Sequence, residues 1–315
     1  MAADRLAGLW TRPDIPPAPV ARARAYLWRW DTVLALAEQA ATVVRVDRFG
    51  DARRALQFCN PGLPIGTTES LFGAYQYLSP GETAPAHRHT AAAIRFVVDG
   101  DDVYTTVNGD ACEMTPGDLI LTPNWNWHDH TNRGTERIVW FDAIDVPLVA
   151  SFDSMFFEHH PAGMQDVAGR NASPALRYPY TEVSRILDAE GSLSPTVAYE
   201  NPDTGGPVTA TIACQMTRVH PTAPTPPRRQ TGGQIHVVFK GRGRSIIAGV
   251  EFAWSAGDVF VVPSWTTVEH HAQEISDLFV ASNRAALEAL HLYRDELLAE
   301  RQHVTGTFDA VPAPT

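Results

Sequence analysis

The chain has 315 residues, 44% of them hydrophobic, and a formal net charge of −11 at pH 7. This length suffices for two domains or one duplicated unit with a sizeable core, so disorder is excluded as the main state. The negative charge argues against nucleic acid and anionic membranes, because both require clustered Lys and Arg. Neither a signal peptide nor a spanning apolar run is present. We expect a soluble, cytoplasmic protein whose partner is a small molecule, with no nucleic acid and no membrane.

The first two predicted parts of the chain differ in their pattern of apolar residues. Residues 1–66 are expected to form an N-terminal helical arm, because apolar residues recur at helical spacing from Val20 to Gln39. Residues 67–150 are expected to form a first β barrel. Short β-branched and aromatic runs such as AIRFVV and DLILT alternate there with Asp-Gly, Asn-Gly and Pro-Gly pairs, which are typical of tight hairpins.

Three further parts follow. Residues 151–208 are interpreted as an ordered connector with a helical segment from about Tyr180 to Ala189. Strands resume over residues 209–285 as a second barrel. Residues 286–315 are expected to form a C-terminal helix and tail, because RAALEALHLYRDELLAERQ carries Leu and Ala at helical intervals.

The two β segments are repeats of each other. PGDLILTPNWNWHDH, starting at Pro116, aligns with AGDVFVVPSWTTVEH, starting at Ala256, and FVVDGDDVYTTVNG aligns with VVFKGRGRSIIAG. The offsets are 257 − 117 = 140 between the Gly-Asp pairs and 241 − 100 = 141 between the turn glycines. Such agreement indicates duplication. Repeated hairpins without crossover helices predict an all-β fold of two barrels with flanking helices.

Three histidines of the first repeat form a candidate metal site. His87 and His89 stand two apart on a predicted strand, so both face the barrel interior, and His128 follows the turn PNWNW on a later strand. Three imidazoles suit Fe(II), Mn, Ni, Cu or Zn, and leave positions open for substrate and dioxygen on a six-coordinate ion. A structural role is commoner for a lone histidine, but the HxH, PGD and Pro-x4-His combination favours metal binding.

These motifs resemble those of the cupin superfamily, whose fold is a double-stranded β-helix or jelly-roll barrel. The carboxylate that usually follows HxH is absent, since Ala93 and Ile94 hold those positions, so the ligand set is three histidines. HRHTAAAIRFVVDG, PGDLILTPNWNWHDH and VWFDAIDVP resemble the bicupin gentisate, salicylate and 1-hydroxy-2-naphthoate dioxygenases. LWRW at 27–30, RRALQFCNPGL at 53–63 and LHLYRDE also match that group.

The resemblance implies an extradiol-type dioxygenase that uses one Fe(II) per chain and O2. It would cleave the ring of an ortho-hydroxy aromatic carboxylate between its carboxylated and hydroxylated carbons. It also implies a homo-oligomer, tetramer or dimer. The alternatives are another metal-cupin oxygenase or isomerase, and a non-catalytic cupin that binds an aromatic acid. The absence of a basic helix-turn-helix pattern disfavours a sensor role.

Several residues are expected to bind substrate. Arg95, six residues after His89, should share its strand face and pair with the substrate carboxylate, because an inward Arg in the apolar run IRFVV needs an anion. The alternative is a surface salt bridge. Arg53 and Arg54 match an arginine pair in the family, one of which reaches the substrate. Phe72 stands where relatives often carry Trp or Tyr.

The candidate catalytic residues are His130 and Asp142. His130 lies two residues past His128, so it could be a proton donor, a base, a partner of a ligand, or a structural imidazole. By resemblance Trp140 gives the pocket an aromatic wall and Asp142 orients a His or Arg; core packing and turn capping are the alternatives. Ala91, Ala92 and Ala93 replace polar residues of gentisate-type enzymes, which argues against gentisate itself.

The second repeat has lost these ligands. The offsets of 140 and 141 place Arg228, Gln230 and Val268 where the first repeat has His87, His89 and His128. We therefore expect this half to give structural support and a subunit interface. A rival interpretation makes Arg228 and Arg229 an anion site, although basic pairs are common on protein surfaces.

Overall fold

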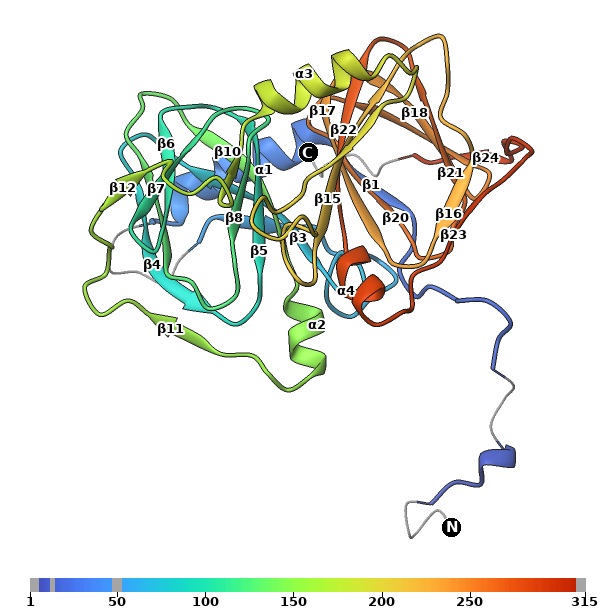
Figure 1. The fold of residues 1–315 in the computed structure, drawn as a ribbon, viewed down its shortest axis with the longest axis horizontal. Helices are drawn as coiled ribbons and strands as arrows, with labels where there is room; N and C mark the ends of the chain where they lie inside the picture. Colours follow the sequence, from blue (N-terminus) through green and yellow to red (C-terminus); the bar gives the residue numbers. More distant parts are fainter. Residues whose placement is uncertain (1–5, 12–14, 47–52, 310–315) are drawn as a thin grey trace.

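The structure, a computed structural model, describes residues 6–11, 15–46 and 53–309. Two β barrels lie side by side, each built from two six-stranded sheets (Figure 1). Four α-helices flank them in this part of the chain: α1 (Trp30–Val43), α2 (Val146–Ser151), α3 (Tyr180–Glu190) and α4 (Arg284–Ala289); η1 (Leu9–Thr11) is a short 3-10 helix. None of the described helices combines the length and apolarity that a membrane crossing requires.

The first barrel carries the three histidines on one of its sheets. Its first sheet has the strand order β13 (Arg177–Tyr178), β8 (Leu119–Thr122), β5 (Ala93–Asp99), β10 (Ile138–Ile144), β3 (Phe72–Leu78) and β2 (Ala55–Gln57). Its second sheet has the order β11 (Phe157–His159), β4 (Thr83–His89), β9 (His128–Asn132), β6 (Val103–Val107), β7 (Asp110–Met114) and β12 (Gly169–Arg170).

The second barrel repeats this order strand for strand. Its first sheet runs β1 (Tyr26–Trp28), β20 (Val259–Val262), β17 (Gln234–Lys240), β22 (Ser276–Ser282), β15 (Ala213–Val219) and β14 (Thr196–Ala198). Its second runs β23 (Asp295–Leu297), β16 (Arg228–Gln230), β21 (Val268–Ala272), β18 (Arg242–Ile247), β19 (Val250–Ser255) and β24 (Gly306–Thr307). The predicted duplication and the all-β barrel class are confirmed.

The register of the two halves also agrees. His87 on β4 is the direct partner of His128 on β9, and Arg228 on β16 is the direct partner of Val268 on β21. The repeat offsets therefore identified equivalent positions, and the second barrel carries an arginine and a valine where the first carries two histidines.

The main hydrophobic core lies between the barrels. Strand alternation sends Ile94 and Phe96 of β5 into this core, where Phe96 stacks on Phe279 of β22 at a ring-centroid distance of 4.1 Å. Full burial of such a side chain contributes roughly 1.5–3 kcal/mol. The same alternation points Arg95 the opposite way, into the first barrel. The second barrel thus supports the strand that positions Arg95.

The N-terminal helix starts later than expected. Residues Tyr26–Trp28 form strand β1, which pairs with β20 of the second barrel and buries Leu27 in that barrel's core. Aromatic residues fit a half-buried strand well, and this distant pairing overrides the helical spacing. Helix α1 begins only at Trp30, whose backbone N–H donates to Asp258 Oδ1 at 2.8 Å. The helix predicted from Tyr180 is confirmed as α3, which lies across the two barrels in Figure 1.

The prediction of a long C-terminal helix is wrong. Helix α4 ends at Ala289, and His291 adopts a positive φ of 58°, which an α-helix cannot continue through. Leu290 and Leu292 are more than half exposed, so these apolar residues at helical spacing do not pack against the barrel as a helix face would. The chain instead adds β23 and β24 to the second barrel. The last predicted tail residues, 310–315, lie outside the described residues.

Candidate metal centre and substrate cavity

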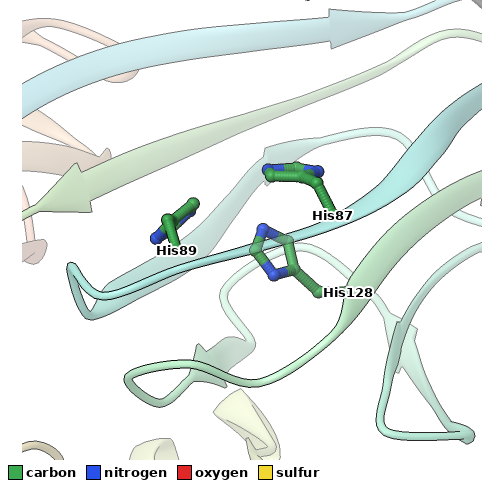
Figure 2. A group of neighbouring side chains, drawn as sticks. All are labelled: His87, His89 and His128. Atoms are coloured by element: carbon green, nitrogen blue, oxygen red, sulfur yellow. The ribbon is translucent and has the colours of Figure 1, made fainter. Parts of the chain in front are cut away.

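His87, His89 and His128 converge inside the first barrel. Strand β4 supplies the first two on one face and β9 supplies the third, so the three rings face a shared space (Figure 2). One ligand nitrogen from each lies within 4.8 Å of the others. Each residue is less than a tenth exposed. Among the described residues, no other cluster of three His, Cys, Asp or Glu side chains could hold a metal ion.

Each of these rings has Nδ1 near a backbone carbonyl, and in His89 and His128 this contact sets the protonation, whereas His87 Nδ1 lies near both the Pro85 carbonyl and Arg53. His89 Nδ1 lies 2.8 Å from the Ala91 carbonyl oxygen, and His128 Nδ1 lies 3.1 Å from that of Asn126. A carbonyl oxygen can only accept, so Nδ1 carries the proton and Nε2 keeps its lone pair. Burial lowers the pKa of all three histidines, that of His87 to about 2, so the imidazoles stay neutral. Neutral imidazole is the form that binds a metal.

The buried His128 Nε2 fits a cation. This atom has no hydrogen-bond partner in the protein, although His128 is fully buried. An unsatisfied buried polar atom costs about 1–3 kcal/mol, so its persistence needs an explanation. A metal ion bound to the three Nε2 atoms would satisfy it. The donor set therefore fits a divalent ion that accepts nitrogen ligands.

Arg53 and Arg54 point in different directions. Arg53 Nη2 donates to the Pro85 carbonyl at 2.6 Å and lies 2.8 Å from His87 Nδ1, at the wall of the histidine cavity. Arg54 turns away and forms an ion pair with Glu82 and a hydrogen bond to Ser79. Of the two arginines, the geometry therefore favours Arg53 as the one that reaches the cavity, because adjacent residues of an extended segment face opposite sides.

Arg95 and Asp142 form a buried ion pair beside the histidines. Arg95 Nε lies 3.5 Å from Asp142 Oδ1, and Arg95 Nη1 donates to Thr122 Oγ1. Burial raises the pKa of Asp142 to about 6, while the charge of Arg95 and the hydrogen bond from Trp140 act in the opposite direction. The expected inward orientation of Arg95 is thus observed, and Asp142 is the group that holds it.

His130 and Trp140 lie against each other, with ring centroids 5.0 Å apart. Thr105 Oγ1 is 2.8 Å from His130 Nδ1, which ties that nitrogen to strand β6 and leaves Nε2 for the cavity. Trp140 is fully buried and does not line the cavity; its indole N–H donates to Asp142 Oδ1 at 3.1 Å. The predicted aromatic wall is therefore corrected: Trp140 supports Asp142 from behind.

The cavity has a volume of about 260 Å³. Besides the three ligands, it is lined by side chains of five strands or their flanks: Arg53, Ala55, Gln57, Phe72, Ala74, Gln76, Arg95, His130, Asp142 and Ile144. Phe72 lies in the wall as expected. Gln57 and Gln76 were missed by the sequence reasoning; Gln76 could have been found, because it follows Phe72 by four residues on β3 and so shares its face.

Known proteins resemble this chain over most of its length. The family described as "Cupin domain" matches residues 74–144. The chain is 35% identical to a 5-aminosalicylate 1,2-dioxygenase from Comamonas sp, covering 91% of this chain and 86% of that one. It is 37% identical to a gentisate 1,2-dioxygenase from Streptomyces sp, covering 91% and 90%. A salicylate 1,2-dioxygenase structure from Pseudoaminobacter salicylatoxidans with gentisate superposes with a TM-score of 0.89 at 33% identity, covering 95% and 92%.

The chain belongs to the gentisate and salicylate 1,2-dioxygenase family of bicupins. The resemblance inferred from the motifs is confirmed, and this is a family of ring-cleaving dioxygenases.

The three alanines that were used to argue against gentisate lie outside the cavity wall. Ala91, Ala92 and Ala93 are fully buried and do not line the cavity. The wall itself carries the neutral amides of Gln57 and Gln76 beside its charged residues. The argument against gentisate therefore stays a prediction.

Proposed function

We propose that the chain is an Fe(II)-dependent dioxygenase that opens the ring of an ortho-hydroxy aromatic carboxylate of the gentisate, salicylate or hydroxynaphthoate type. It would insert both atoms of O2 between the carboxylated and hydroxylated carbons, an extradiol-type cleavage. The observation that carries this proposal is the convergence of ring nitrogens from three buried, neutral histidines in one cavity with the buried Arg95. Three neutral ligands leave a divalent ion its full charge, which suits a dianionic substrate.

His87, His89 and His128 would hold the iron. When bound, iron supplies the chelation of the substrate's carboxylate and hydroxyl groups and the activation of O2. Because that binding uses the Nε2 atoms, His87 Nδ1 carries a proton, and Arg53 cannot then donate to it. Arg53 keeps the Pro85 carbonyl as an acceptor, which holds its guanidinium at the wall of the cavity.

The remaining cavity residues would bind and orient the acid. Arg95 is positioned by Asp142 and Thr122 to meet the substrate carboxylate with a charge-assisted hydrogen bond. His130 is neutral because burial lowers its pKa well below the usual value. With Nδ1 tied to Thr105, its Nε2 is the atom that would hold or move the proton of the substrate hydroxyl.

The test is turnover under controlled oxygen. Protein loaded anaerobically with Fe(II) is mixed with salicylate, gentisate, 5-aminosalicylate or 1-hydroxy-2-naphthoate, and O2 is then admitted. We expect one O2 consumed per ring-opened product, with at least one of these acids. Stoichiometric iron binding with no turnover of any of them would contradict the proposal and favour a non-catalytic aromatic-acid-binding cupin.

The pH profile should report Asp142. Above about pH 6 its carboxylate is ionised and holds Arg95, whereas protonation on lowering the pH removes this anchor. We expect kcat/KM to fall as the pH decreases through about 6. Asp142→Asn should have lower activity and lose this step. Iron content is measured at each pH, because protonated histidines also release metal; a fall that follows iron loss alone, unchanged in Asp142→Asn, would refute the assignment.

We also propose a homo-oligomer, dimer or tetramer. Phe152, Phe156 and Phe157 are more than half exposed, and Phe157 stacks on the ligand His87 with ring centroids 5.2 Å apart. Exposed apolar clusters of this kind are typical of protein interfaces. Light scattering after size exclusion should give a mass of two or four chains of 34.5 kDa, and a monomer at micromolar concentration would contradict this proposal.

A further inference from the structure

The second barrel has a cavity of its own at the position equivalent to the metal site. Its volume is about 210 Å³, compared with about 260 Å³ in the first barrel. Arg228, His236 and His270 line it, at the positions that His87, Arg95 and His130 occupy in the first repeat. The loss of the metal ligands has therefore left space rather than a filled core.

His236 is an unsatisfied polar side chain inside this cavity. It is 2% exposed, and neither ring nitrogen has a hydrogen-bond partner in the protein. It stacks on Phe260 with an interplanar angle of 11°, which fixes the ring against the wall. Burial lowers its pKa well below the usual value, so it offers one N–H donor and one lone pair. Two orphaned atoms on a buried ring indicate a missing polar partner.

His270 is held by its neighbours on one side of the cavity. The Trp254 indole N–H donates to Ser245 Oγ at 2.9 Å, and Ser245 Oγ is in turn 2.7 Å from His270 Nδ1. This hydrogen bond ties Nδ1 to strand β18. Nε2 is the ring nitrogen away from this wall, and it is the polar atom that His270 offers to a ligand.

The charge of the cavity is positive. Arg228 is the charged member of its lining, no carboxylate is among the lining residues, and Arg228 Nε is buried without a hydrogen-bond partner. Arg228 Nη2 has only a long contact of 3.5 Å to Asp295, and both side chains are partly exposed. Thr225 Oγ1 accepts the backbone N–H of His270 at 2.8 Å and keeps its own proton to donate. An arginine beside neutral donors suits a carboxylate.

One side of the wall, on β21 and β22, is apolar and includes Val268, Leu278 and Val280; the wall also has neutral polar side chains, from Ser194, Thr196, Gln215, Thr217 and Gln234. Val280 stands where the first barrel has the cavity residue Asp142. The second cavity therefore lacks a buried carboxylate that would compete with a ligand for Arg228. We propose that the second barrel binds a small monocarboxylic acid of about benzoate size, with its carboxylate on Arg228 and its apolar body against β21 and β22. This site carries no metal and no chemistry, and does not depend on the function proposed above.

Arg228 and Arg229 provide a matched pair of variants. Arg228 reaches the cavity, whereas Arg229 pairs with Glu296 at 2.6 Å on the outside and packs over Trp265. Only the first should therefore matter for binding. Arg228→Met should weaken this site for benzoate at least about tenfold, since it removes a charge-assisted hydrogen bond, and Arg229→Met should leave the affinity unchanged.

The probe is benzoate, titrated calorimetrically into the anaerobic Fe(II)-loaded protein. We expect a benzoate site that persists in Arg95→Met, which impairs the first cavity, and whose affinity falls at least about tenfold in Arg228→Met. Inorganic phosphate should bind this site more weakly than benzoate, because it has no apolar body. Ring-cleavage activity should be the same in Arg228→Met and wild type, which shows that the variant is folded.

A crystal grown with 4-bromobenzoate locates the ligand directly. Anomalous scattering from bromine inside the second barrel, beside Val268 and Val280, would support the proposal. Bromine found solely in the first barrel, or benzoate binding that Arg228→Met and Arg229→Met weaken equally, would overturn it. Equal binding of phosphate would overturn the assignment to an organic acid.

Discussion

Replacing His128 by Ala is expected to abolish iron retention and ring cleavage. Of the three ligands, His128 is the one whose Nε2 is buried without a hydrogen-bond partner. It lies on β9 directly opposite His87 of β4. Loss of a group that merely supports a metal ligand typically costs 10–100-fold in metal affinity or activity, so loss of a ligand should exceed about 100-fold. The measurement is iron per chain after desalting, followed by O2 uptake with the best substrate.

Val268→Ala is the matched control in the other barrel. Val268 occupies the repeat-equivalent position and pairs with Arg228 as His128 pairs with His87. Val268→Ala also replaces a buried side chain by a smaller one at the equivalent place in its barrel. A loss of stability that comes only from the smaller side chain should therefore occur in this variant as well. Iron content and activity should stay at wild-type levels. Equal iron retention in His128→Ala and Val268→Ala would refute the ligand assignment.

The repeat and the ligands could be predicted because their signals are local. The Gly-Asp turns, the alternation along β5 and the HxH spacing on β4 each depend on a few adjacent residues. Strand pairing then brought His128 beside His87 in a register that the repeat offset already required. Arg95 followed from the same alternation, because its neighbours Ile94 and Phe96 belong to the core between the barrels.

The errors arose where distant contacts decide the conformation. Tyr26–Trp28 has helical spacing but pairs with β20, more than 200 residues later, and Asp295–Leu297 pairs with β16 instead of extending a helix. The difference between Arg53 and Arg54 depends on how this edge segment lies over β4. Whether Trp140 lines the cavity depends on side chains from several strands that fill the space in front of it.

Arg95→Met should be the most damaging change that leaves the iron in place. Arg95 is 3% exposed and faces the cavity, so its charge acts on a substrate carboxylate with little screening. Removing one partner of a buried charge pair costs about 2–5 kcal/mol, which corresponds to a loss of roughly 30-fold to several thousand-fold in kcat/KM. Iron content should be unchanged. Arg137→Met, which removes a partly exposed arginine paired with Asp99 at the end of the same strand, should have little effect.

Two mechanisms could produce that loss, and a second substitution separates them. Arg95→Met leaves the Asp142 carboxyl buried without its cation, which by itself would distort the cavity. Arg95→Met with Asp142→Asn removes both charges. If Arg95 binds substrate, the double variant stays as impaired as the single one, and the preference for salicylate over salicylamide is lost in both. Recovery of kcat/KM in the double variant would instead show that Arg95 serves only to neutralise Asp142, and a different group, with Arg53 the nearest candidate, would then have to meet the carboxylate.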